Sequence, residues 1–380
     1  MLKIFYLIIA LVFLFFPRSP ILAAEPTRWI VPNYHRVLNP AINSGSTSWG
    51  NYFSNESQIE GTLNRVDVYG LFIEEIGWND GNFLSNLVPI LKKKNIPIAT
   101  EGSVSGCNPN LVDGTEWANY LLNSVIKPLY DAGGVLNYYA IDAFPGGLIT
   151  RFSQQGCITN IDQALPELIK FMKRFHEVHP ETKFGLISNF PNYGYGSNMS
   201  YWLANDPLGD FRSHFEKILQ AVEATGEHLY FLHVDNPYDY AIGAVPNPYG
   251  PSQTTDWVQR ILDLEFQAKS HGLRFGLIYN SERGGQGNSL VSADDKLYFE
   301  DTLAFINLYK NRGGNPDDMI VESWYPHPSA LFPDNQPYTF SYLVKNAFPI
   351  AHTDISLLRQ FLSIFTNIFD YNQLVINFGK

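Results

Sequence analysis

Six polar residues share one feature in this sequence: each ends a short apolar segment. They are Glu101, Asp142, Asn189, Asp235, Asn280 and Glu322, and Glu282 follows two positions after Asn280. Four of the six are carboxylic acids. A carboxylate removed from water is costly unless it is paired or hydrogen-bonded. Acids that recur at equivalent positions therefore indicate a site that does chemistry.

Paired carboxyl groups suit the cleavage of a glycosidic bond. One carboxyl, in its protonated form, assists the leaving oxygen, while the other, ionised, attacks the anomeric carbon or activates water. This chemistry needs neither a metal nor a cofactor, and the sequence predicts neither. The structural alternative is that the acids cap the helices that follow or pair with Lys and Arg.

The apolar segments alternate with longer amphipathic segments, which predicts an α/β fold, a (β/α)8 TIM barrel. The predicted strands cover residues 29–31, 66–73, 96–100, 136–141, 184–188, 229–234, 274–279 and 319–321. The predicted helices cover residues 82–94, 116–130, 163–176, 210–225, 256–270 and 294–311. In such a barrel the carboxyl ends of the strands converge on one face, where catalytic groups are found.

The strand count leaves two registers open. If Trp29–Val31 is the first strand, the eighth ends at Glu322, and this register is preferred. If Val66 begins the barrel, the last strand must come from residues 338–344, which look more like the start of a helix. In either case we expect one domain with a long N-terminal excursion up to Gly61 and long loops between strands and helices.

The preferred register makes YYAIDAFP strand four and FGLIYNSE strand seven, and VESWYPHP holds the end of strand eight together with the loop after it. With these segments the chain resembles the superfamily of barrel glycoside hydrolases that retain configuration. The resemblance implies that Asp142 is the acid/base and Glu282 the nucleophile. It also implies that Trp324 floors the subsite for the cleaved sugar. The acid in that superfamily is normally Glu after Asn, whereas Asp142 follows Ile.

The other strand-end residues are candidate ligands for the sugar. Asn189, Asp235 and Asn280 can hydrogen-bond sugar hydroxyls, and Glu101 and Glu322 complete the set. Glu101 can also raise the pKa of a neighbouring carboxyl, because like charges disfavour joint ionisation. Aromatic residues of the rim are candidates for stacking on sugar rings, with ordinary packing as the alternative. They are Trp78, Tyr193, Tyr195, Tyr238 and Tyr325.

The N-terminus has the layout of a cleaved secretory signal. Lys3 precedes an apolar run from Ile4 to Phe16, and two alanines precede Glu25. Cleavage after Ala24 would leave residues 25–380 as the barrel domain, secreted or periplasmic and without membrane contact. The apolar run is short for a bilayer, so a retained anchor is the weaker interpretation.

The net charge restricts the partners. The formal charge is −11, and removal of Lys3 and Arg18 with the leader lowers it to −13. With no basic cluster beyond Lys92–Lys94, this charge argues against nucleic acid or an anionic membrane as a partner. An oligo- or polysaccharide that is neutral or cationic is favoured over a polyanion. We expect a monomer.

The two cysteines, Cys107 and Cys157, lie in loops that follow neighbouring predicted strands. In an oxidising compartment an even number of cysteines favours a disulfide. Two free, buried thiols are the alternative.

Three functions stay open at this point. The leading hypothesis is a glycoside hydrolase. The second is a non-catalytic barrel that binds glycan, which would keep the aromatic residues and tolerate loss of the acids. The third is a metal-dependent hydrolase or deacetylase built on His233 and Asp235, which lie two apart on one strand, although an HxH pair is missing.

Overall fold

A computed structural model describes residues 25–32, 53, 56–78, 83–104, 113–142, 144–146, 158, 160–246, 254–285, 292–323 and 326–349. Contacts divide the chain into a first unit, which ends at Ala347 and holds all the strands and helices of the barrel, and a second unit from Phe348. Only residues 348 and 349 of the second unit lie within the described ranges.

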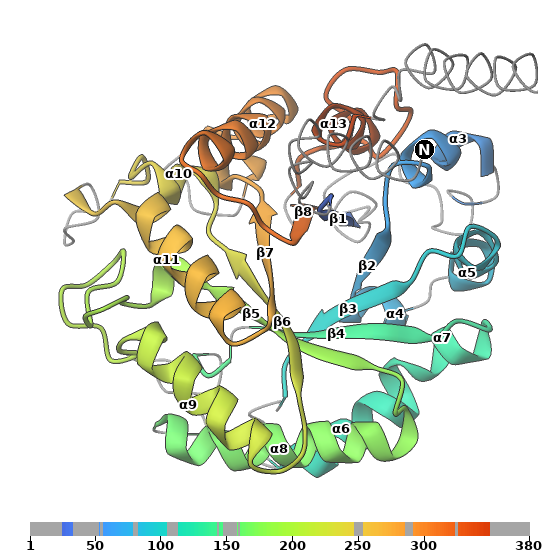
Figure 1. The fold of residues 1–380 in the computed structure, drawn as a ribbon. Coiled ribbons are helices and arrows are strands. Elements are labelled where there is room, and N and C mark those ends of the chain that lie inside the picture. The colour runs from blue at the N-terminus through green and yellow to red at the C-terminus, as the bar shows by residue number, and fades with distance from the viewer. Residues whose placement is uncertain are drawn as a thin grey trace, which may run out of the picture. The chain divides into compact units, whose positions relative to one another are not determined.

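Eight parallel strands close into a barrel in chain order, which confirms the (β/α)8 fold (Figure 1). The strands are β1 (Thr27–Pro32), β2 (Val68–Phe72), β3 (Ile98–Gly102), β4 (Leu136–Asp142), β5 (Lys183–Asn189), β6 (Leu229–Asp235), β7 (Arg274–Tyr279) and β8 (Asp318–Ser323). Their near-continuous apolar sequences suit a parallel sheet that is buried on both faces.

The first of the two predicted registers is correct. β1 pairs with β8 along its whole length, from Thr27 opposite Asp318 to Pro32 opposite Ser323, and this pairing closes the barrel. The segment that the other register needs as a strand forms the helix α13 (Phe340–Ala347). β4 and β7 are therefore the fourth and seventh strands, as the resemblance requires.

Helices lie outside the ring of strands (Figure 1). They are α3 (Glu56–Leu63), α4 (Ile73–Trp78), α5 (Phe83–Lys93), α6 (Gly114–Tyr120), α7 (Lys127–Asp131), α8 (Ile161–Val178), α9 (Phe211–Glu223), α10 (Tyr238–Ala241), α11 (Trp257–Ser270), α12 (Asp295–Asn311) and α13. A π-helical turn, Leu121–Val125, interrupts the single helix predicted over residues 116–130. In the part of the chain that is described, no helix is long and apolar enough to cross a bilayer.

Local signals set the ends of these helices. The side chains of five residues accept hydrogen bonds from backbone N–H groups at the first turn of α6, α8, α9, α11 and α12. These capping residues are Asp113, Asn160, Asp210, Asp256 and Asp294. Gly272 and Gly313 follow α11 and α12 with φ of 77° and 91°, a conformation that favours glycine, and turn the chain back into β7 and β8.

The interior of the barrel is filled by side chains from all eight strands. Its buried cluster comprises Trp29, Val31, Val68, Ala99, Ala140, Ile187, Phe231, Ile278 and Ile320. On the outer face of the barrel, Tyr139 of β4 and Phe184 of β5 pack their rings against Phe171 and Phe175 of α8. The barrel is thus a packed core that supports the two faces at its ends.

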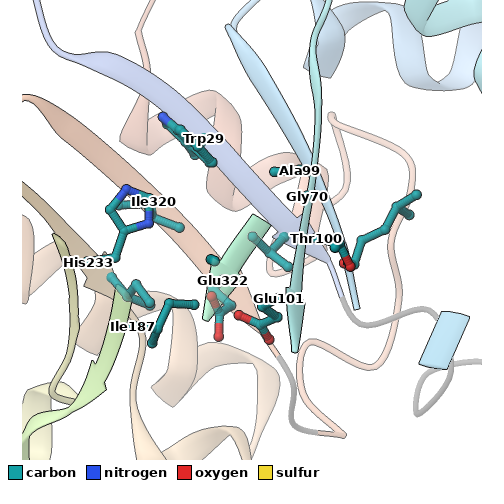
Figure 2. A pocket seen from close by; sticks show the side chains of 13 residues that line it. Trp29, Gly70, Ala99, Thr100, Glu101, Ile187, His233, Ile320 and Glu322 are labelled. Atoms are coloured by element: carbon teal, nitrogen blue, oxygen red, sulfur yellow. The ribbon is translucent and has the colours of Figure 1, made fainter. Parts of the chain in front are cut away.

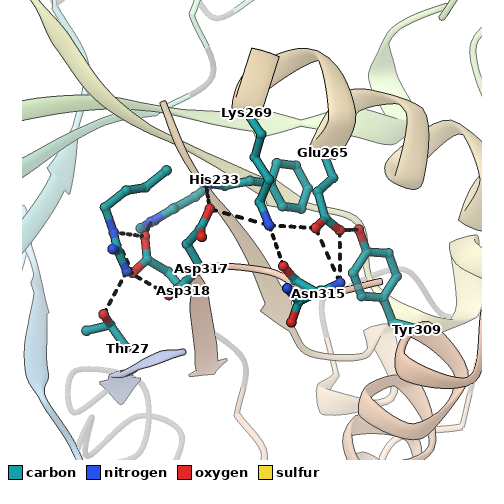
Figure 3. Close-up of polar contacts among 10 residues, drawn as sticks. Thr27, His233, Glu265, Lys269, Tyr309, Asn315, Asp317 and Asp318 are labelled. Atoms are coloured by element: carbon teal, nitrogen blue, oxygen red, sulfur yellow. Dashed lines mark hydrogen bonds and ion pairs between the residues drawn. The ribbon is translucent and has the colours of Figure 1, made fainter. Parts of the chain in front are cut away.

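The amino-terminal end of the barrel is tied together by one carboxylate (Figure 3). Asp318 is 1% exposed and accepts hydrogen bonds from Arg274, at 2.6 Å, and from the Trp29 indole, at 3.1 Å. His233 Nε2 lies 3.4 Å from the same carboxylate. Burial alone would raise the pKa of Asp318, but the hydrogen bonds and charges of His233 and Arg274 hold it below its ordinary value. These contacts join strands β1, β6, β7 and β8.

We expect Asp318→Asn to destabilise the fold by about 2–3 kcal/mol, because an amide replaces a buried carboxylate that accepts hydrogen bonds from Arg274 and from the Trp29 indole. Urea unfolding followed by circular dichroism measures this change. A matched control is Asp131→Asn, which removes an exposed partner of Lys127 on α7. The control should change stability by less than about 0.5 kcal/mol, and equal effects of the two variants would contradict the prediction.

Candidate active site

The six residues that end the predicted strands, here called the mouth ring, face the inside of the barrel. They are Glu101, Asp142, Asn189, Asp235, Asn280 and Glu322. Side chains two positions apart on a strand point to the same side. Asp235 stands two positions after His233, which lines the interior, and the other five members each stand two positions after a core residue of the same segment. Those core residues are Ala99, Ala140, Ile187, Ile278 and Ile320.

Burial within the mouth ring is uneven. Asn280 is fully buried, and Glu322 and Asp235 are 4% and 8% exposed. Glu101 is half-buried, whereas Asp142 is exposed at the end of β4. The ring therefore runs from deeply buried acids on β6 and β8 to an acid on β4 that solvent reaches.

The acids of the ring act on one another. Burial raises the pKa of Glu101 well above its ordinary value, and the charges of Glu322 and Asp142 add to the shift. Burial likewise raises the pKa of Glu322, with further contributions from Asp235 and Asp142. Burial raises the pKa of Asp235 to about 7, although a hydrogen bond from Asn280 opposes the shift. These groups therefore retain protons at pH values where an ordinary carboxyl is ionised.

The structural alternative for these acids does not hold for three of them. In the described ranges no Lys or Arg side chain pairs with Glu101, Asp235 or Glu322. The caps of α6, α8, α9, α11 and α12 come from other residues. Three acidic side chains are thus gathered at one end of the barrel without a compensating cation.

A small cavity enters the barrel at this end. It is lined by Glu101 and Glu322 at the mouth and by Trp29 and His233 deeper down, among apolar side chains (Figure 2). Figure 2 shows the carboxyl groups of Glu101 and Glu322 close to each other. The water-accessible volume is about 20 Å³, room for about one water molecule.

Glu282 is not among the residues that line this cavity and lies in a 3-10 turn (Glu282–Gly284) after β7. Its side chain is 4% exposed. Burial raises the pKa of Glu282 to about 7, the charges of Asp235 and Asp239 add to the shift, and a hydrogen bond from Tyr240 opposes it. Asp235 is within electrostatic reach of both Asp142 and Glu282 and so connects the two proposed catalytic residues.

The turn that carries Glu282 is held by buried hydrogen bonds. The Glu282 backbone N–H donates to Asp239 Oδ2 at 2.7 Å. Ser281 Oγ lies 2.9 Å from both Asp239 Oδ2 and Asp301 Oδ2. Arg283 Nε lies 3.2 Å from the same Asp301 oxygen. The position of Glu282 is thus fixed from α10 and α12 as well as from β7.

The two amides of the ring have different environments. Asn280 Nδ2 donates to Asp235 Oδ1 at 3.0 Å, and its Oδ1 is buried without a hydrogen-bond partner among the described residues. Asn189 is half-buried and lies opposite Asp235 in the β5–β6 register. Asn280 therefore orients a carboxyl and offers one acceptor of its own.

Several predicted residues have other positions or are not described. Tyr193 is 1% exposed, and its hydroxyl accepts the Gly146 N–H, so the alternative of ordinary packing applies to this side chain. Tyr195 is directed to Gln267 of α11, and Tyr238 lies near Phe305 of α12. Trp324, Tyr325, Cys107, Cys157 and the leader to Ala24 lie outside the described residues, as does the side chain of Trp78.

The metal hypothesis gains no support from His233. Its Nε2 is directed to Asp318, at the opposite end of the barrel from Asp235. Within the described ranges no group of three His, Cys, Asp or Glu side chains is arranged to hold a metal ion.

Sequence reasoning missed the residues that hold Glu282, namely Asp239, Tyr240 and Asp301. The first two lie in the short helix Tyr238–Ala241, which follows β6. An acid and an aromatic residue directly after a barrel strand were a usable signal. Asp301 had none, because it lies in the middle of α12, where an acid ordinarily faces solvent.

No protein-family model matches the chain, and no curated protein matches its sequence. Solved structures do match. An endo-β-1,4-mannanase double mutant from Cellulomonas fimi has 12% identity and a TM-score of 0.49, over 86% of this chain and 73% of that one. The Ignisphaera aggregans GH53 catalytic domain has 10% identity and a TM-score of 0.46, over 82% of this chain and 88% of that one. The 3-keto-D-glucoside 4-epimerase from E. coli has 12% identity and a TM-score of 0.38, over 78% of this chain and 91% of that one.

Tyr240→Phe tests the contact between Tyr240 and Glu282. It removes a hydrogen bond to the ionised carboxylate, so it should raise the pKa of Glu282 from its value of about 7, by about one pH unit. A carbon-13 NMR titration of labelled glutamate side chains, assigned with Glu282→Gln, measures the shift. Tyr120→Phe, on the exposed face of α6, is the control, and a similar shift there would count against the contact.

Proposed function

We propose that this protein is a glycoside hydrolase that cleaves its substrate with carboxyl groups at the carboxyl end of the barrel. The observation that carries the proposal is the mouth ring: acids from four strands gather on the inward face, and three have raised pKa values and no cationic partner. A fold gains no stability from such an arrangement, since each buried charge is costly. Acids whose environments shift their pKa values are characteristic of catalytic sites.

Asp142 and Glu282 are the proposed catalytic pair. Asp142 gives its proton to the glycosidic oxygen as the bond from that oxygen to the anomeric carbon breaks, and the Glu282 carboxylate bonds to the carbon. Water then attacks the same carbon, gives a proton to Asp142, and releases Glu282 as a carboxylate. The positions after β4 and β7, the charge connection through Asp235 and the rigid turn at Glu282 support these roles.

The remaining residues would bind the sugar. Asn189 and Asn280 can meet hydroxyl groups, and Glu101, Asp235 and Glu322 would surround the reacting ring. Trp324 is proposed as the platform beneath that ring. The proposal also includes secretion, with cleavage after Ala24 and a disulfide between Cys107 and Cys157.

Asp142→Asn and Glu282→Gln should each lower kcat by about 10²- to 10⁴-fold or more, because each removes a group that takes part in bond breaking. The measurement is release of reducing ends from a panel of polysaccharides, with circular dichroism as the check on folding. Asp131→Asn, on the outer surface, is the matched control. A folded double variant with unchanged turnover would rule out this pair, and glycan binding without turnover by the parent would favour a non-catalytic barrel.

The pH profile assigns the roles within the pair. If Glu282 is the nucleophile it must be ionised, so kcat/KM should rise with pH through about 7 and fall on acidification below it. If Glu282 is instead the general acid, it must be protonated, so the same pKa appears on the alkaline side of the pH profile. In that case kcat/KM falls as the pH rises through 7. Initial rates of the parent and of Tyr240→Phe between pH 4 and pH 9 (roughly the range in which both proteins should stay folded) distinguish the two, since the variant should move the limb to higher pH.

A further inference from the structure

The cavity beneath the mouth ring has an unusual lining. Two carboxyl groups, from Glu101 on β3 and Glu322 on β8, stand at its entrance. Its other lining residues are apolar apart from Thr100 and His233, and Thr100 donates its hydroxyl to the Leu71 carbonyl. Apart from the two carboxyl groups, the cavity therefore offers a guest few polar atoms.

Glu322 is the decisive side chain. It is 4% exposed and lines the cavity, and among the described residues its carboxyl group has no hydrogen-bond or ion-pair partner. Its neighbour Asp235 uses Oδ1 to accept from Asn280. Buried polar groups ordinarily have partners, so a carboxyl group that faces a cavity in this way points to a donor from outside.

We propose that the Glu101–Glu322 cavity binds the protonated amine of an unacetylated amino sugar, so that the substrate is a glycan that contains such residues. This inference rests on the proposed function, whose substrate it narrows. An ammonium group has about the size of a water molecule and three donors, which matches the volume and the acceptors at the entrance. A sugar hydroxyl would bring only one donor and no charge, and an N-acetyl group would bring bulk.

Charge balance supports the same guest. Burial and mutual repulsion raise the pKa values of Glu101 and Glu322 above their ordinary values, so the acids hold protons when no cation is present. A cation that enters would replace those protons. Other titratable groups around the two acids are Glu74 on α4, Asp142 on β4, His233 and Asp235 on β6, and Tyr298 on α12.

Titration calorimetry with the full chain tests the proposal at neutral pH. The probes are D-glucosamine, D-glucose and N-acetyl-D-glucosamine, followed by chitosan, chitin and cellulose oligosaccharides of equal length. We expect the amine to bind at least about tenfold more tightly than either neutral sugar, the gain of one charge-assisted hydrogen bond. Equal affinities for D-glucosamine and D-glucose would overturn the proposal.

Glu322→Gln is the diagnostic variant, because it keeps the shape of the side chain and removes its charge. It should reduce the preference for the amine at least about tenfold and leave D-glucose affinity less affected. Glu223→Gln, exposed on α9, is the control and should keep the preference. If Glu322→Gln fails to fold, ammonium chloride competition on the parent gives a second readout: it should weaken D-glucosamine binding and leave D-glucose binding unchanged.

The outcomes separate this inference from the proposed function. Cleavage of cellulose oligosaccharides without preference for chitosan would leave a glycoside hydrolase and overturn the amine cavity. Selective binding of D-glucosamine without turnover of any glycan would support the cavity and overturn the hydrolase. If potassium or ammonium ions fully occupy the Glu101–Glu322 cavity and the protein shows no selectivity among sugars, the cavity is an inorganic cation site. That result would overturn the inference.

Discussion

The alternation of side chains along a strand is the constraint on which this molecule depends. Because residues two apart face the same side, a strand that buries Ile320 in the barrel must also turn Glu322 inward. The same geometry couples Ala99 to Glu101 and Ala140 to Asp142. Eight strands in one closed ring therefore convert a periodic sequence pattern into a cluster of acids, and no single loop has to bring those acids together.

The two ends of β8 show how the barrel treats a buried acid in opposite ways. At the amino-terminal end, Arg274, the Trp29 indole and His233 surround Asp318, and its pKa is lowered. Four residues along the strand, burial raises the pKa of Glu322, and the charges of Asp235 and Asp142 add to the shift. The first acid contributes to stability, because its charge is compensated. The second acid, Glu322, lowers stability. The apolar core of the barrel and the compensated contacts of Asp318 must offset that cost.

The fold was largely readable from the sequence, and the site only in part. Short apolar strands, Asp and Asn caps and glycines after the helices are local signals. They were sufficient to predict the strand order and the mouth ring. The contacts that fix the position of Glu282 could not be predicted in this way. It depends on Asp239 and Asp301, 62 residues apart in sequence and joined through the Ser281 hydroxyl. Such a contact is set by how α10 and α12 pack on the barrel, which no local pattern encodes.

The uncompensated charge also bears on which function the barrel has. A module that only binds glycan needs aromatic faces and hydrogen-bond donors, and its stability would rise if amides replaced the acids of the mouth. An enzyme has a reason to keep the acids, because carboxyl groups with pKa values near 7 can exchange protons at neutral pH. Asp235 and Glu282 both have pKa values of about 7, and the charge of Asp235 contributes to the raised pKa of Glu282. A carboxyl group that becomes ionised near neutrality suits the nucleophile's role proposed for Glu282 better than passive recognition, and the hydrogen-bonded turn that carries Glu282 holds it in place.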